Sequence, residues 1–160
     1  MRFIVDHNVG KLVRWLRMMG YDSVFFNSGE DSVMVKQAMA EGRIVLTRDS
    51  AIIERRVAKE GRLKVVLFRS EDPEEQMRKL MGTFDLVGGM RPFTLCLECN
   101  RALEHRTREE VAERVPPYVY KTQTQYMECP SCHRIYWRGT HWAAMTKKLE
   151  ELAEAGGREH

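Results

Sequence analysis

The chain has 160 residues, a formal net charge of +3 and a hydrophobic fraction of 43%. This length allows one ordinary domain, or a small domain followed by a minidomain, and the hydrophobic fraction excludes disorder over most of the chain. The sequence has no apolar run near the roughly 20 residues of a membrane span, so we expect no membrane partner. The first residues carry charges throughout and lack a small-residue cleavage site, so we expect a cytoplasmic protein without a signal peptide.

Strand and helix signals alternate through the first half of the chain. Short apolar runs predict strands at residues 2–5, 21–26, 43–47 and 63–68. Between and after them, the spacing of apolar and capping residues predicts helices at residues 9–19, 31–41 and 50–60 and from Pro73 onward. This alternation predicts an α/β fold with a parallel sheet and helices on both of its faces.

The alternation stops near residues 88–92, where the sequence reads Gly-Gly-Met-Arg-Pro, and all four cysteines follow this point. We therefore expect a first domain at residues 1–88 and a smaller module at residues 92–155. Within the module, the charge-rich segment at residues 104–115 predicts a helix that ends at two consecutive prolines. Residues 142–155 predict a last helix with its apolar side chains on one face.

The cysteines are Cys96, Cys99, Cys129 and Cys132, two C-x2-C pairs that are separated by 29 residues. Cytosolic chains rarely keep structural disulfides, so this spacing predicts a four-cysteine zinc site in which each pair forms one tight turn. Because four thiolates leave no open coordination position, we expect the zinc to be structural rather than catalytic. The alternative is a pair of redox dithiols, but this region lacks the thioredoxin-like setting that such dithiols need.

Three acidic residues fall where predicted strands end. Asp6 follows the first strand, Asp31 follows the second strand and its loop, and Asp49 follows the third strand. Functional groups gather beyond the carboxyl ends of parallel strands, so these carboxylates are candidate ligands for Mg²⁺ or Mn²⁺ in phosphodiester hydrolysis. The simpler alternative is that each acid caps a helix, and the metal site requires the sheet order to bring the strand ends together.

Basic residues lie near these acids in the sequence. Lys11, Arg14 and Arg17 are spaced by three on the first predicted helix, and Arg48 directly precedes the third acid. Placed near a metal, these cations could hold the phosphates of a nucleic acid, whereas the alternative is an ordinary solvated face. Arg55 and Arg56 are predicted to be plain surface residues.

The second part also interleaves cations with aromatic side chains, a combination that suits stacking on single-stranded bases. The members are Arg91, Arg101, Arg106, Arg108, Lys121, Arg134 and Arg138, with Tyr118, Tyr120, Tyr126, Tyr136 and Trp137. The alternative is that the aromatic residues form the small core of a zinc module. We favour this alternative for Trp137 and Trp142 and leave the role of the arginines open.

Several segments resemble one known family. Asp6, the octapeptide Gly-Lys-Leu-Val-Arg-Trp-Leu-Arg at residues 10–17 and the following Gly-Tyr-Asp are similar to the opening of the Mut-seven C-terminal ribonuclease family. Residues 44–49 resemble its strand-and-acid signature, and the two cysteine pairs with residues 135–142 resemble its zinc-ribbon end. The resemblance covers about residues 1–146.

This resemblance implies a PIN-like nuclease domain fused to a C-terminal zinc ribbon, with RNA as the partner and Mg²⁺ or Mn²⁺ as the catalytic metal. The catalytic acids and metal ligands that it implies are Asp6, Asp31 and Asp49. PIN-like sites often have a fourth acid, commonly two residues after the third-strand acid, and Ala51 stands at that position here. Glu30 and Glu54 are the candidate substitutes, and the number of catalytic metals stays open.

We therefore expect a divalent-metal-dependent endoribonuclease. The alternative is a non-catalytic nucleic-acid-binding or adaptor protein, which the missing fourth acid favours and the three retained acids disfavour. A phosphorylated receiver domain fits poorly, because it needs a pair of acids near the first strand and a lysine at a late strand end. Only Asp6 stands at the first strand, and the nearest late cation is Arg69.

Overall fold

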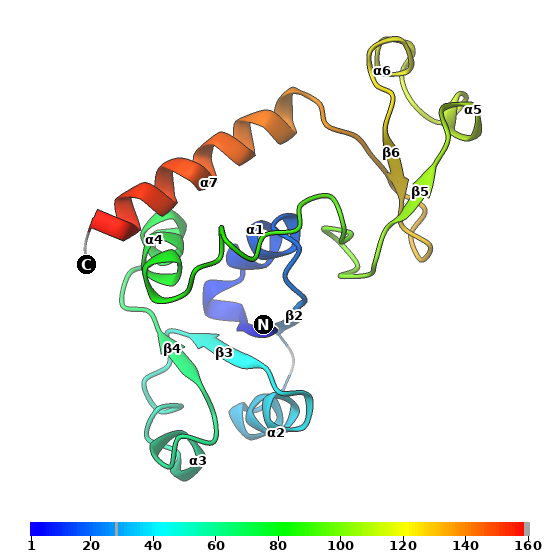
Figure 1. The fold of residues 1–160 in the computed structure, drawn as a ribbon. Coiled ribbons are helices and arrows are strands. Elements are labelled where there is room, and N and C mark those ends of the chain that lie inside the picture. Colours follow the sequence, from blue (N-terminus) through cyan, green and yellow to red (C-terminus); the bar gives the residue numbers. More distant parts are fainter. Residues whose placement is uncertain (28, 159–160) are drawn as a thin grey trace.

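The computed structural model describes residues 1–27 and 29–158, and the chain folds into two parts (Figure 1). The first part is a four-stranded parallel sheet in the order β2–β1–β3–β4. Its strands are β1 (Phe3–Asp6), β2 (Ser23–Phe26), β3 (Ile44–Thr47) and β4 (Val65–Leu67). The parallel sheet that the sequence predicts is confirmed.

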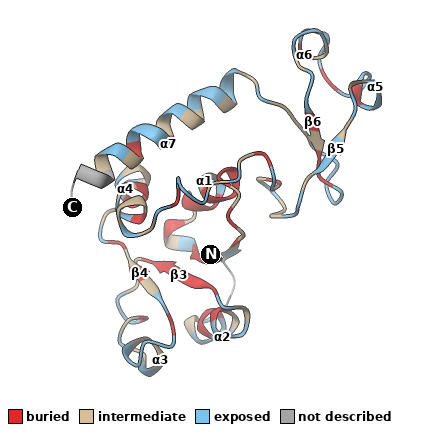
Figure 2. Ribbon diagram, viewed as in Figure 1, coloured by how far each residue is buried: buried red, intermediate tan, exposed pale blue. Residues whose placement is uncertain are grey.

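Helices cover both faces of this sheet. They are η1 (His7–Val9), α1 (Leu12–Met18), α2 (Asp31–Glu41), α3 (Arg56–Lys59) and α4 (Pro73–Thr83). Side chains alternate along each strand, so Phe3 and Val5 enter the core beside α1 and α4, whereas Ile4 enters the core beside α2. Figure 2 shows this burial along the sheet and along the inner sides of the helices. Because both faces are buried, the strands are continuous apolar runs.

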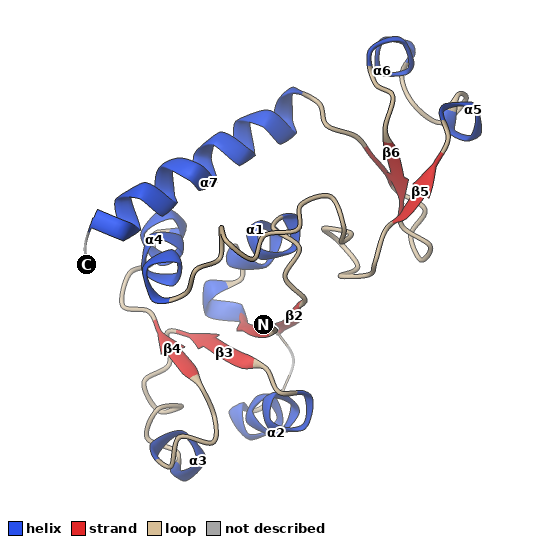
Figure 3. Ribbon diagram, viewed as in Figure 1, coloured by secondary structure: helices blue, strands red, loops and turns tan. Residues whose placement is uncertain are grey.

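The second part contains a small antiparallel sheet (Figure 3). The first cysteine turn precedes this sheet in the sequence, and the second turn joins two of its strands. Its elements are β5 (Glu104–Arg106), α5 (Arg108–Val111), α6 (Pro117–Thr122), β6 (Tyr126–Glu128) and β7 (Ile135–Tyr136). These elements enclose a separate core of Val111, Val115, Val119 and Tyr126.

The last helix, α7 (Thr140–Arg158), returns from the second part to the first. Leu149 and Leu152 of α7 join the core of the first part beside α4 (Figure 1). The division into residues 1–88 and 92–155 stays a prediction, and α7 packs across that division. Within the part of the chain that the structure describes, no helix combines the length and apolar character needed to span a bilayer.

The helix predicted at residues 50–60 is wrong in extent, because only Arg56–Lys59 is helical. Residues 50–54 form turns instead. The Asp49 carboxylate accepts a hydrogen bond from the amide of Ala51 at 2.9 Å, which closes a local turn and delays the helix.

The helix predicted at residues 104–115 is also wrong. Its first residues form β5, which pairs with β6, and only Arg108–Val111 is helical. Thr107 and Glu110 form a capping box, in which each side chain accepts from the other residue's backbone amide, so the helix begins only after Thr107. Pro117 does not end a helix but begins α6, in the first turn, where proline is tolerated.

The segment that links the two parts crosses the end of α1. The amide of Arg91 donates to the carbonyl of Met19 at 2.8 Å, and Gly20 lies against the backbone of Arg91. Gly20 has a φ of +88°, and a Cβ atom at this position would overlap the carbonyl oxygen of Arg91. Both the backbone conformation and the close approach of the linking segment therefore require glycine here.

We expect Gly20→Ala to destabilise the fold by more than about 2 kcal/mol, because it combines strain at positive φ with a clash against backbone. The matched control is Gly42→Ala. Gly42 also has a positive φ, of +65°, but no atom lies within 4 Å of the position that a Cβ would occupy. This control should cost only about 1 kcal/mol. Urea unfolding of both variants measures the difference, and equal losses would show that the linking segment moves aside freely.

Candidate functional site

The sheet order brings the predicted acids to one edge. Strands β1 and β3 are parallel neighbours, so Asp6 at the end of β1 and Asp49 just after β3 lie at the same edge. Asp31 is the first residue of α2, and its carboxyl group lies within hydrogen-bonding reach of the Asp49 carboxyl. The charge of Asp6 is close enough to act on Asp31.

Asp6 is held in one orientation by its neighbours and is only 3% exposed. Its Oδ2 accepts from the hydroxyl of Thr47 at 2.7 Å and from Nδ2 of Asn8 at 3.3 Å. Its Oδ1 accepts from the amide of His7 at 2.9 Å. These bonds preorganise the carboxylate as a ligand.

The hydroxyl of Thr47 connects two of the acids. It accepts a hydrogen bond from the amide of Asp49 at 3.0 Å while it donates to Asp6. Thr47 is fully buried at the end of β3. The spacing between the ends of β1 and β3 is therefore fixed by a side chain as well as by the sheet.

Asp31 and Asp49 change each other's ionisation. Contact with the Asp49 carboxyl raises the pKa of Asp31, and burial and the charges of Asp49 and Asp6 act in the same direction. The pKa of Asp49 is lowered, because the Asp31 carboxyl and the amide of Ala51 donate to it. Two carboxyl groups in contact mark a concentration of negative charge, which a divalent cation would relieve.

Helix capping accounts for only part of this arrangement. Asp6 caps η1, and Asp49 closes the turn at Ala51. Asp31, however, is not the N-cap of α2; that residue is Glu30, whose side chain makes no capping bond. The potential ligand atoms of the acidic site lie farther apart than those of the cysteine site. Among the described residues, the four cysteines are the only group of three or more potential ligands whose ligand atoms all lie within 4.8 Å of one another.

Two of the predicted phosphate-binding residues flank a polar cleft next to Asp6. Lys11 lines this cleft with His7, Asn8 and Glu71. The Arg48 guanidinium donates to the Glu71 carboxylate at 3.4 Å, and its backbone amide donates to Asn8 at 3.0 Å. Both cations therefore lie on the side of the acidic site that Asn8 and His7 form.

The third predicted phosphate-binding residue, Arg14, points toward the second part of the molecule. Its guanidinium donates to the carboxylate of Glu98, in the first cysteine turn, at 3.1 Å. The phosphate-binding role of Arg14, Lys11 and Arg48 stays a prediction, and the structure does not gather the three around the acids.

The prediction that Arg55 is a plain surface residue is wrong. Arg55 is partly buried, and its charge lowers the pKa of both Asp31 and Asp49. It is the N-cap residue of α3, directly after the turns that replace the predicted helix at residues 50–60.

The candidates for a fourth acid occupy different places. The exposed Ala51 contributes its amide, rather than a carboxylate, to Asp49. Glu54 forms an ion pair with Lys59 at 3.0 Å, while Glu30 stands directly before Asp31. Whether either glutamate joins the acidic site stays a prediction.

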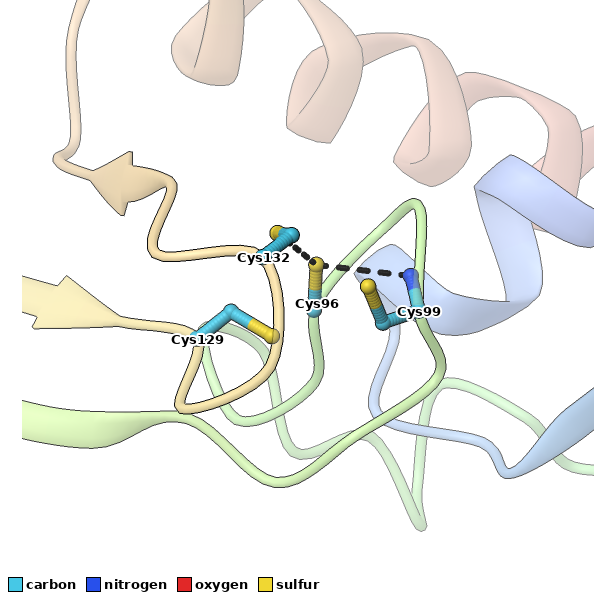
Figure 4. A group of neighbouring side chains, drawn as sticks. All are labelled: Cys96, Cys99, Cys129 and Cys132. Atoms are coloured by element: carbon cyan, nitrogen blue, oxygen red, sulfur yellow. Dashed lines mark hydrogen bonds between the residues drawn. The ribbon is translucent and has the colours of Figure 1, made fainter.

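The four cysteines come together from two turns of matching geometry (Figure 4). In each turn, the amide of the residue after the second cysteine donates to the carbonyl of the first cysteine. These bonds are Asn100 to Cys96 at 3.0 Å and His133 to Cys129 at 2.9 Å. Asn100 and His133 adopt φ values of 60° and 64°, so both turns close through a left-handed residue.

Hydrogen-bond donors point at the sulfur atoms. The amide of Cys99 donates to Cys96 Sγ at 3.4 Å, and the amide of Ser131 donates to Cys129 Sγ at 3.4 Å. The Tyr136 hydroxyl accepts from the amide of Leu97 at 3.2 Å and lies 3.1 Å from Cys96 Sγ, so its proton is free to point at the sulfur. Such donors stabilise thiolate ligands.

The sulfur spacing suits a tetrahedral ion. A metal–sulfur distance of about 2.3 Å places tetrahedral sulfur atoms about 3.8 Å apart. The Sγ atoms of Cys96 and Cys132 are 3.7 Å apart, and all four cysteines are free of disulfides. The four thiols could therefore hold a metal ion such as zinc.

The first cysteine turn is fastened to the amino end of the parallel sheet. The buried Arg17 donates through Nη1 to the carbonyl of Leu97 at 2.9 Å and through Nε to the carbonyl of Ser23 at 3.0 Å, so the prediction that Arg17 holds a phosphate is wrong. The side chain of Asn100 accepts from the amide of Ser23 at 3.0 Å. Because Ser23 begins β2, the cysteine turn lies at the end of the sheet opposite to the acids.

These features define an α/β protein with acids at its strand ends and an appended module that could bind a metal ion. Residues 1–149 match the family described as the Mut7-C RNAse domain, and the chain belongs to this family. The resemblance found in the sequence is thereby confirmed. None of the curated proteins and none of the solved structures matches the chain.

We expect the purified protein to contain one tightly bound metal ion per chain. Cys129 is fully buried, so Cys129→Ser should lower the metal content and unfold the second part, because metal binding and folding are coupled in such modules. The control is Ser131→Ala, an exposed position in the same turn. Plasma mass spectrometry measures the content and identifies the metal. Full metal content in Cys129→Ser would contradict a four-cysteine site.

We expect Asp31→Asn to stabilise the protein in buffer without added divalent cations. Because the folded pKa of Asp31 is raised, the wild type loses stability as the pH rises from the unfolded value of about 4 through the folded value. The variant has no carboxyl group at this position, so it does not undergo this loss. Its free energy of unfolding should exceed that of the wild type by up to about 1 kcal/mol at pH 7, since the pair is partly exposed and screened. Thermal melts should show the gain shrinking as the pH falls.

The same variant tests cation binding. Mn²⁺ that binds the native acids raises the melting temperature of the wild type, and Asp31→Asn should abolish that rise. The control is Glu150→Gln, which removes an exposed carboxylate on α7. This variant should keep the rise in melting temperature with Mn²⁺. An undiminished rise in Asp31→Asn would place the manganese elsewhere.

Proposed function

We propose that the protein is a divalent-metal-dependent endoribonuclease that hydrolyses RNA phosphodiester bonds at Asp6, Asp31 and Asp49. The observation that carries this proposal is the convergence of these carboxylates at one edge of the sheet, in a chain of the Mut7-C RNAse domain family. Carboxylate oxygens are the ligands that Mg²⁺ and Mn²⁺ prefer. The strand-end position leaves the site open to a long polymer.

The three acids hold Mg²⁺ or Mn²⁺ in this proposal. When bound, the ion supplies a water of lowered pKa and neutralises charge on the phosphate. Thr47 and Asn8 fix the Asp6 carboxylate, so little reorganisation is needed when the ion enters. The cation binds ionised carboxylates, and the pKa of Asp31 is raised, so protonation of Asp31 at low pH makes cation binding weaker.

Cations beside the acids position the RNA. Arg55, whose charge acts on Asp31 and Asp49, holds an oxygen of the scissile phosphate. Lys11, in the polar cleft next to Asp6, and Arg48, which bonds to Asn8 and Glu71 of that cleft, contact a neighbouring phosphate. Because arginine presents a planar set of donors, Arg55 also fixes the orientation of the phosphate.

The four cysteines hold a structural zinc ion in this proposal. A closed set of four thiolates leaves no position for water or substrate, so the zinc folds the second part and takes no part in hydrolysis. Reduced thiols of this kind fit a cytoplasmic location, where disulfides are rare.

A second candidate function is RNA binding without cleavage. It is favoured by Ala51, which stands where related sites often have an acid, and by the ion pair that occupies Glu54. The convergence of the other three acids favours the nuclease.

Cleavage of a labelled RNA pool with Mn²⁺ or Mg²⁺ tests the proposal. We expect the wild type to cleave, and Asp6→Asn and Asp49→Asn each to lose at least about a hundredfold in rate, because a metal ligand is removed. Glu150→Gln serves as the matched control and should cleave as the wild type does. A chelator is a poor control, because it also removes the zinc.

Equal cleavage by all variants would identify a contaminating nuclease and leave the acids without a role. Binding of RNA by every protein, with cleavage by none, would favour the second candidate function.

A further inference from the structure

A cleft of about 450 Å³ lies between the second part, α1 and α7. Its aromatic lining residues are Tyr118, Tyr136, Trp137 and Trp142. Tyr118 is 69% exposed, and both tryptophans are only partly buried. The cleft therefore presents aromatic surface to solvent.

These aromatic residues do more than complete the small core. Trp137 packs at the edge of that core, as the sequence predicts. Trp142 instead packs against the core of the first part and stands edge-to-face with Phe93, with ring centroids 5.3 Å apart, so the prediction for Trp142 is wrong. Tyr118, by contrast, lies on α6 as an exposed aromatic side chain that its own module leaves in solvent.

A polar cleft continues directly from the aromatic one. The two share Arg14, Ile135, Tyr136 and Trp137, and the polar cleft adds Glu98, Arg114, His133 and Arg134. Arg114 is paired with Glu128 at 2.7 Å. Arg134 is exposed and forms no ion pair with any residue of the described chain.

Most of the charge along this surface is positive. From residue 129 to residue 149 the sequence has no Asp or Glu, and Arg134 of this segment lines the polar cleft. Glu98 is the one acid that lines the polar cleft, and Arg14 pairs with it at 3.1 Å. An aromatic surface that continues into a cationic one complements a ligand with planar rings and regularly spaced negative charge.

From this juxtaposition we propose that a single-stranded segment of RNA binds in the cleft, with bases stacked on Tyr118 and Trp142 and phosphates near Arg134 and Arg14. Unpaired bases offer free faces for stacking, whereas those of a duplex are already stacked on each other. An apolar peptide would leave the cationic side of the cleft unmatched. The choice of RNA over another polyanion rests on the proposed function.

The cleft and the acids cannot hold the same nucleotide. Met18 and Leu97 line the cleft. The carbonyl of Leu97 accepts a hydrogen bond from Arg17 at the place where the first cysteine turn meets the amino end of the sheet. The acids lie at the carboxyl end, and a four-residue strand such as β1 spans about 13 Å. The cleft therefore binds RNA at nucleotides other than those that flank the scissile bond, and it favours substrates with an unpaired segment at that distance.

Fluorescence anisotropy with a labelled oligouridylate tests the cleft, in buffer without Mg²⁺ or Mn²⁺ so that the RNA stays intact. We expect Tyr118→Ala and Arg134→Ala each to weaken binding at least about fivefold, because a stacking surface or a phosphate contact is lost. Tyr118→Trp keeps the stacking surface and should restore wild-type affinity. Arg56→Ala, on α3, removes a cation whose side chain is 89% exposed and should bind as the wild type does.

Affinity unchanged in both Tyr118→Ala and Arg134→Ala would overturn the cleft proposal, even if the wild type cleaves RNA. An equal loss for a blunt RNA duplex would overturn the preference for single strands. If Tyr118→Ala loses affinity but the wild type cleaves no RNA, the cleft stands and the nuclease proposal fails. Tyr118 and Arg134 are exposed, so neither variant is expected to unfold the protein.

Discussion

The parallel pairing of β1 with β3 is the constraint on which the acidic site depends. It brings Asp6 to the same edge as Asp49, although 42 residues separate them in the sequence. The buried hydroxyl of Thr47 completes the arrangement, since it donates to Asp6 and accepts from the amide of Asp49. Because successive side chains of a strand face opposite ways, a slip of one residue would turn Asp6 away from this contact and expose apolar side chains. The same register thus fixes the core and the acids.

Electrostatic repulsion opposes that arrangement. The carboxyl groups of Asp31 and Asp49 are in contact, and the charge of Asp6 adds to the repulsion. The fold tolerates this repulsion because neutral donors hold Asp6, while Arg55 offsets part of the charge on the other two acids. Sites that bind a cation commonly reduce the stability of the empty protein in this way. The same repulsion makes the site selective for a positively charged ligand.

The sequence predicts the parts whose physical causes are local. Apolar runs buried on both faces identify the four parallel strands, and the cysteine spacing identifies the two turns. The charge-rich segment at residues 104–115 reads as a helix, although tertiary pairing with β6 makes β5 of its first residues. The sequence does not predict that Arg55 acts on the acids. Its position follows a series of turns where the sequence predicts a continuous helix at residues 50–60. The direction of Arg14 depends on the docking of a distant cysteine turn, which no local pattern records.

The docking of the second part gives the two candidate sites a fixed relation to each other. Arg17 and Asn100 fasten the first cysteine turn to the start of β2. The linking segment lies against Gly20, and α7 returns to the core beside α4 through Leu149 and Leu152. Three separate attachments leave the small module little freedom to rotate, so the aromatic cleft stays at a constant distance from the acids. A ribonuclease built in this way would select its RNA by the position of an unpaired segment rather than by the sequence at the cut.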